Sequence, residues 1–86
     1  MVIVCKEYLN LPGMYEAITE HFGENGIRVI CRKEYSEWEI NSSVKFNIIE
    51  TNSLIHVILN GPQEETAEVI ADLDGVIKQF NLAKTA

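Results

Sequence analysis

The chain of 86 residues is poor in several residue types, and each shortage narrows the class of protein. It has two cysteines, too few for the disulfide framework of a small secreted domain. It has only two prolines and five glycines and no biased segment, which argues against a disordered chain. No apolar run approaches the roughly 20 residues that span a bilayer, and the first residues lack the apolar stretch of a signal peptide. We therefore expect a single cytoplasmic domain over residues 1–86, without membrane contact.

Basic residues are also scarce, with seven Lys and Arg against 13 Asp and Glu, for a formal net charge of −6. A surface of this sign repels a phosphate backbone, so direct nucleic-acid binding is not expected. Hydrophobic residues make up 47% of the chain, which is enough apolar material for one small core.

The motifs of common catalytic and cofactor sites are missing. The chain has no glycine-rich phosphate loop, nucleophile elbow or His-Glu-x-x-His sequence. Cys5, Cys31, His21 and His56 lack the spacing of a zinc site, and the two thiols are interpreted as small buried hydrophobes. His21 is interpreted as a cation near the negative end of a helix. We expect no metal and no cofactor, and we favour a binding protein over an enzyme.

Strand and helix patterns alternate along the chain. Segments with strand composition or period-two alternation cover residues 1–8, 27–35, 38–49 and 54–60. Apolar residues recur at helical spacing after Asn10, the expected N-cap, as far as Gly23, and again after Pro62. The order β-α-β-β-β-α predicts an α+β two-layer sandwich: a mixed four-stranded sheet with two helices on one face. A right-handed crossover should place the first two strands side by side and parallel.

A hairpin at Asn52-Ser53 fixes one register. A two-residue loop there pairs Ile48 with Val57 and Phe46 with Leu59, which places both apolar sets on one face. A slip of one residue would separate them, so the pattern favours this register.

One face of the predicted sheet has no helix over it, and it is unusually apolar. Its expected residues are Arg28, Ile30, Arg32, Lys45, Asn47, Ile49, Leu54, His56 and Ile58, with no aromatic among them. The four aliphatic residues predict a contact patch with a cationic border, for a homodimer or another protein. Isolated aliphatic residues are, however, ordinary on strand surfaces. Trp38 is either part of the core rim or an exposed anchor of this interface.

Acidic residues follow the solvent faces of both predicted helices. Glu16, Glu20 and Glu24 are spaced by four on the first helix, as are Glu64, Glu68 and Asp72 on the second. Such stripes either keep a surface soluble or attract a basic partner.

The sequence favours a non-catalytic protein-binding module, a small acidic regulator or inhibitor that acts through protein contacts. The alternative is a small-molecule binding protein or weak enzyme with its site on the open sheet face of a homodimer. A compact anion would then be held by Arg28, Arg32 and Lys45, with His56 beside them as the group for proton transfer.

Overall fold

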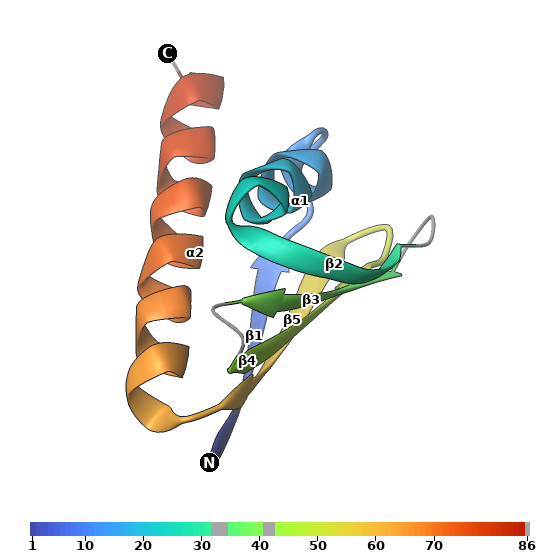
Figure 1. The fold of residues 1–86 in the computed structure, drawn as a ribbon. Coiled ribbons are helices and arrows are strands. Elements are labelled where there is room, and N and C mark those ends of the chain that lie inside the picture. The colour runs from blue at the N-terminus through green and yellow to red at the C-terminus, as the bar shows by residue number, and fades with distance from the viewer. Residues whose placement is uncertain (32–34, 41–42, 86) are drawn as a thin grey trace.

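The chain folds into one sheet with two helices on the same side of it (Figure 1). The computed structural model describes the backbone of residues 1–31, 35–40 and 43–85, and their side chains except at 24–31, 84 and 85. The elements are β1 (Val2–Leu9), α1 (Met14–Asn25), β2 (Gly26–Cys31), β3 (Tyr35–Ile40), β4 (Val44–Glu50), β5 (Leu54–Gly61) and α2 (Gln63–Thr85). The predicted α+β class, with two layers and both helices on one face, is confirmed.

The strands of the described residues form one five-stranded sheet in the order β1-β5-β4-β3-β2, and all four neighbouring pairs are antiparallel. The predicted mixed sheet is therefore wrong. α1 does connect two strands that run in the same direction, but β1 and β2 stand at opposite edges with three strands between them. Alternation in a sequence indicates the faces of a strand, but it does not say which strands are neighbours.

The segment 38–49, predicted as one strand, is divided between β3 and β4. These strands pair with each other, with Trp38 opposite Phe46 and Ile40 opposite Val44, and Ser43 lies in the turn between them. A hairpin here adds the fifth strand without changing which side chains share a face.

The predicted register between β4 and β5 is confirmed. Phe46 lies opposite Leu59, and Ile48 lies opposite Val57. The two-residue loop is closed by the backbone N–H of Thr51, which donates to the carbonyl oxygen of Leu54 at 2.9 Å.

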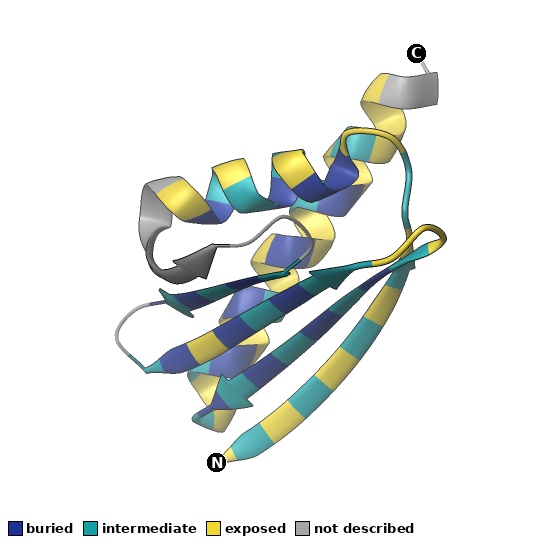
Figure 2. Ribbon diagram, turned by 90° about the vertical axis from the view of Figure 1, so that its right-hand side faces the viewer, coloured by how far each residue is buried: buried dark blue, intermediate teal, exposed yellow. Residues whose placement is uncertain are grey.

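The inner face of the sheet, together with both helices, forms the core. Its strand side chains are fully buried at every second position of β4 and β5: Val44, Phe46, Ile48, Ile55, Val57 and Leu59 (Figure 2). The helices add Met14, Ile18, Phe22, Val69, Leu73 and Ile77. The rings of Phe22 and Phe46 are 4.7 Å apart and join α1 to the sheet. Each such side chain stabilises the fold by roughly 1.5–3 kcal/mol, so burial on this face fixes the strand faces.

Trp38 belongs to the core, with only 5% of its surface exposed. Its indole N–H donates to Ser36 Oγ at 3.0 Å, and the hydroxyl of Tyr15 donates to the same oxygen at 3.1 Å. A Cβ added at Gly23 of α1 would contact the indole ring at 3.6 Å, so helix and ring are packed together. The core interpretation of Trp38 is confirmed, and its assignment to an exposed interface is wrong.

Asn10 does not cap α1, which begins at Met14. The Asn10 side-chain amide donates to the Thr51 carbonyl oxygen at 2.7 Å and to the Glu50 carboxylate at 3.1 Å. Its backbone N–H donates to the carbonyl oxygen of Ser53 at 3.0 Å. The side chain is therefore used to join the end of β1 to the β4–β5 hairpin, and the predicted N-cap is wrong.

Gly61 marks a close approach between two parts of the chain. A Cβ at this position would lie 2.8 Å from the Ser43 carbonyl oxygen and 3.2 Å from the Val44 Cα. Only glycine lets the end of β5 pass the β3–β4 turn at this distance. Gly75 differs, because a Cβ there would meet nothing within 4 Å and α2 passes through it without interruption.

Candidate functional site

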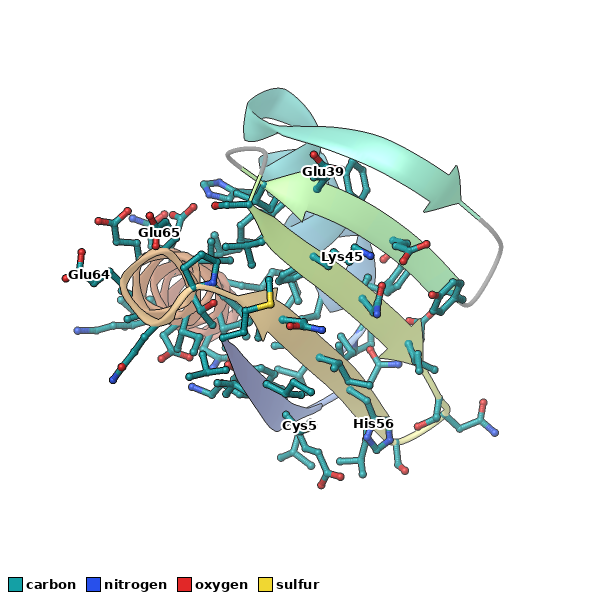
Figure 3. The ribbon with its side chains drawn as sticks, turned by 60° about the horizontal axis from the view of Figure 1, so that its bottom comes forward. Cys5, Glu39, Lys45, His56, Glu64 and Glu65 are labelled. Atoms are coloured by element: carbon teal, nitrogen blue, oxygen red, sulfur yellow. The ribbon has the colours of Figure 1, made fainter. Side chains whose placement is uncertain are left out.

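The sheet face opposite the helices carries the main candidate surface. Tyr35, Ile49, Leu54, His56 and Ile58 are partly exposed on it, and each has a buried chain neighbour that faces the core. β1 adds further side chains through its pairing with β5, and Ile3 and Leu9 among them are 69% and 72% exposed. We define the outer-face patch as Ile3, Cys5, Leu9, Tyr35, Ile49, Leu54 and Ile58. Figure 3 shows this face, with Cys5, His56, Lys45 and Glu39 spread across it.

The strand registers arrange this face in rows. One row runs across four strands through Tyr35, Ile49, His56 and Glu7. The next rows contain Glu37, Asn47, Ile58 and Cys5, and then Glu39, Lys45, Asn60 and Ile3. Leu54 and Leu9 lie opposite each other at the other end, beside the β4–β5 loop. Leu9, Leu54, Ile49 and Tyr35 therefore lie toward that loop, with the Glu7–His56 pair among them. Glu37, Glu39 and Lys45 lie toward the β3–β4 turn, in the same rows as Ile58 and Ile3.

Most of the predicted contact residues with described side chains lie on this face. Ile49, Leu54, His56 and Ile58 have the expected position. Ile30 is paired with Glu37 in the register of β2 and β3, but its side chain lies outside the described residues.

Four members of the outer-face patch were missed from the sequence: Ile3, Cys5, Leu9 and Tyr35. Both alternating sets of residues 2–9 contain apolar side chains, so only the pairing with β5 identifies the outer set. Tyr35 was counted along one strand over 27–35, but it opens the separate strand β3, where its register partner is Ile49. The expectation that this face has no aromatic residue is therefore wrong.

The described basic residues of this face do not gather into an anion site. Lys45 lies opposite Glu39 and Asn60, two rows from His56, which is roughly 13 Å along the strand. His56 Nδ1 lies 3.3 Å from a Glu7 carboxylate oxygen, which disfavours a bound anion there.

The border of the outer face is mixed in charge rather than cationic. Each described base on it, Lys45 or His56, has a carboxylate as register partner. The side chain of Arg28 and all of Arg32, the other expected border residues, lie outside the described residues.

The acidic residues of the two helices have different surroundings. Glu16, Glu20, Glu64 and Glu68 are exposed, as predicted for solvent faces. Asp72 is exposed as well, and its carboxylate also lies 2.9 Å from His21 Nε2, which joins α2 to α1. Glu20, His21 and Asp72 line a groove between the helices, whose remaining walls include small residues. Within the described residues, no group of three or more His, Cys, Asp or Glu side chains is placed to hold a metal ion.

A polar cluster braces β1 against α2 on the inner side. Lys6 Nζ lies 2.9 Å from Asp74 Oδ1, and the hydroxyl of Tyr8 donates to the same oxygen at 2.7 Å. The hydrogen bond with Asp74 raises the pKa of Lys6, while partial burial and the bond to Asp74 raise the pKa of Tyr8 to about 12. Partial burial acts to raise the pKa of Asp74, but the hydrogen bonds from Lys6 and Tyr8 outweigh it and lower that pKa. The cluster is a structural brace, because each charge has a partner.

Cys5 is exposed on the outer face, so its predicted role as a buried hydrophobe is wrong. The side chain of Cys31 lies outside the described residues. Their strands, expected to be neighbours, stand at opposite edges of the sheet.

Over the residues that the structure describes, no helix has the length and apolar character needed to cross a membrane. In the comparisons with known proteins, no family model matches the chain, and no curated protein is significantly similar to it.

Proposed function

We propose that this chain is a non-catalytic protein-binding module, a small acidic regulator or inhibitor that contacts its partner through the outer-face patch. The observation that carries the proposal is the exposure of Ile3 and Leu9, 69% and 72%, next to the partly exposed Ile49, Leu54 and Ile58. Several exposed apolar side chains on one face are typical of contact sites.

The energetics support association through this patch. Burying one aliphatic side chain contributes roughly 1.5–3 kcal/mol. Association costs about 4 kcal/mol or more in lost translational and rotational freedom. Covering several members of the patch therefore gives a gain of the same order as that cost, and Tyr35 adds an aromatic residue of the type that often dominates binding energy.

The patch also indicates the chemistry of the partner. Its apolar end should meet an apolar surface, and its mixed end, with Glu37, Glu39 and Lys45, should meet polar groups of both signs. The net charge of −6 and the exposed helix acids favour a partner that is basic overall, because opposite charges speed encounter.

Binding is favoured over catalysis by the setting of the outer-face histidine. His56 and Glu7 lie opposite each other on the outer face of β5 and β1, with 33% and 63% of their side chains exposed, so a substrate there would stay in contact with water. Acid–base catalysis depends on a concave site that positions the reacting groups.

The test compares two double variants with the same change in charge. The chain is used to capture and identify its partner from cells of its source, and the purified pair is then studied by calorimetry. Ile49→Lys with Ile58→Lys should weaken binding at least tenfold, because it places two charges in the apolar patch. Gln63→Lys with Ala67→Lys, on the exposed surface of α2, should change affinity less than threefold.

Equal affinity of the two double variants would place the contact away from the outer face. Glu64→Lys with Glu68→Lys separates the role of the acidic helix, since it should slow association and reduce its salt dependence without abolishing the complex.

A further inference from the structure

We propose that two copies of this chain form a dimer by antiparallel pairing of their β1 strands, with Cys5 of one copy opposite Cys5 of the other. The pairing joins the two sheets edge to edge into one continuous sheet. It goes beyond the proposed function and uses the backbone edge of β1. Because Ile3, Cys5 and Leu9 also belong to the outer-face patch, substitutions on β4 and β5 are used below to separate the two proposals.

Among the strands that the structure describes, β1 has a neighbour on one side only, and this edge strand is regular over its whole length. All eight residues from Val2 to Leu9 pair with β5 without a shift in register. The opposite edge strand, β2, has six residues and an irregularity between Arg28 and Ile30. Bulges and short length protect an edge strand from pairing with another chain, and β1 has neither.

The backbone groups that face this edge follow from two hydrogen bonds. The backbone N–H of Asn10 donates to the carbonyl oxygen of Ser53. These two residues form the next opposed pair after Leu9 and Leu54, so they are a hydrogen-bonded pair of the ladder. Because hydrogen-bonded and non-bonded pairs alternate in an antiparallel ladder, the even-numbered residues of β1 direct their N–H and C=O groups toward β5. The bond from Thr51 N–H to the Leu54 carbonyl oxygen agrees with this. It shows that the even-numbered residues of β5 direct their backbone groups toward β4, so the odd-numbered ones face β1 and pair with its even-numbered residues. The odd-numbered residues Ile3, Cys5, Glu7 and Leu9 therefore direct these groups to the free edge.

The apolar side chains indicate a second copy as the occupant. Three of the large hydrophobic residues that stand out as exposed are on or next to β1: Met1 at 93%, Ile3 at 69% and Leu9 at 72%. With Cys5 on the two-fold axis, Met1 of each copy lies opposite Leu9 of the other. The Met1 and Leu9 side chains of each such pair then cover each other. On the inner side, Val2 lies opposite Tyr8, an aromatic and β-branched pair of the kind that stabilises sheets.

The charges on β1 are compatible with this register and disfavour the one centred on Lys6. Lys6 is paired with Asp74, and Glu7 contacts His56, so each charge is compensated within its own copy. In the Cys5-centred register, Lys6 lies opposite Val4 and Glu7 lies opposite Ile3, so no like charges face each other. A shift that centres the pair on Lys6 would place two ammonium groups opposite each other, which destabilises a sheet.

The dimer can be tested by placing charged side chains at position 5, because Cys5 is exposed. Wild type should show a monomer–dimer equilibrium in sedimentation equilibrium under reducing conditions, and Cys5→Ser should keep it. Cys5→Lys and Cys5→Glu should each raise the dimer dissociation constant at least tenfold, since two like charges then meet on the axis. An equimolar mixture of the Lys and Glu variants should recover dimer, because opposite charges meet there.

Circular dichroism and melting of each variant verify that the fold is kept. A wild type that stays monomeric at about 1 mM would overturn the proposal, as would a dimer that Cys5→Lys leaves intact. A mixture that fails to recover dimer would also overturn the register. The Ile49→Lys and Ile58→Lys substitutions should leave this dimer unchanged, so failure here is distinguishable from failure of the proposed function.

Discussion

The two faces of β4 and β5 carry similar side chains in opposite environments. On the inner face, Val44, Phe46, Ile48, Ile55, Val57 and Leu59 are fully buried beneath the helices. On the outer face, Ile49, Leu54 and Ile58 belong to the same residue classes but remain partly exposed. Burial of one face is therefore enough to fix the register between β4 and β5. The aliphatic residues of the other face are then available for contact with another molecule.

The sharpest way to test this difference is a substitution on each face. Phe46→Ala should lower the free energy of unfolding by about 3–5 kcal/mol, because it opens a cavity where Phe46 packs on Phe22. Ile58→Thr, which keeps a β-branched residue on the outer face, should cost less than about 1 kcal/mol. Urea denaturation measures both values. Equal losses would mean that the outer face is as important for stability as the core.

The core also contains the hydrogen bonds that Tyr15 and Trp38 donate to Ser36. Removing the Ser36 hydroxyl should have the next largest effect on stability. Ser36→Ala leaves the Trp38 indole N–H without its acceptor inside the core, at a cost of about 1–3 kcal/mol. Ser43→Ala is the matched control, because the Ser43 hydroxyl has no hydrogen-bond partner among the described residues. Thermal unfolding should separate the two variants, and similar melting temperatures would contradict a structural role for the Ser36 hydroxyl.

The smallest effect concerns pH and the brace between β1 and α2. The pKa of Asp74 is lowered, so its contribution to stability is present above its ordinary pKa of 3.8 and is lost as pH falls through the lower folded value. The pKa of Tyr8 is raised from 10.0 to about 12, so its contribution is present below pH 10 and is lost as pH rises toward 12. The raised pKa of Lys6 gives an alkaline loss of the same sign, beginning above 10.5. Solvent screening keeps both effects small.

Unfolding free energies measured across the pH range verify this brace. Asp74→Asn should flatten both limbs of the profile, since it removes the partner of Lys6 and Tyr8. Tyr8→Phe should reduce the loss above pH 10, and it should also lessen the loss at acid pH, because it removes one of the two hydrogen bonds that lower the pKa of Asp74. A wild-type profile that Asp74→Asn leaves unchanged would show that the brace adds nothing to stability.

The parts of the fold that depend on local pattern were predictable from the sequence. The loop at Asn52-Ser53 and the matching alternation on both sides of it give the register of Phe46 with Leu59. Helical spacing identifies the buried side of α1, including Ile18 and Phe22.

The parts that depend on distant pairing were not predictable. Residues 2–9 are apolar in both alternating sets, so nothing local says that β1 pairs with β5 rather than β2. Ile49 and Ile58 were identified on the outer face because the hairpin gives their register. Ile3 and Leu9 were not, because their position depends on the pairing of β1 with β5. Tyr35 was assigned to the wrong face because the alternation restarts where β3 begins.

The pairing of β1 with β5 has a consequence for the order in which the molecule assembles. The paired residues are 45 to 59 positions apart along the chain, whereas β2 to β5 each pair with the strand that follows or precedes them. A ribosome therefore releases β1 well before the strand that completes its hydrogen bonds. Short loops close at lower entropic cost than long ones, so we expect the β2–β5 meander to assemble first and β1 to dock onto it last. Until then, the apolar side chains of β1 would be open to aggregation.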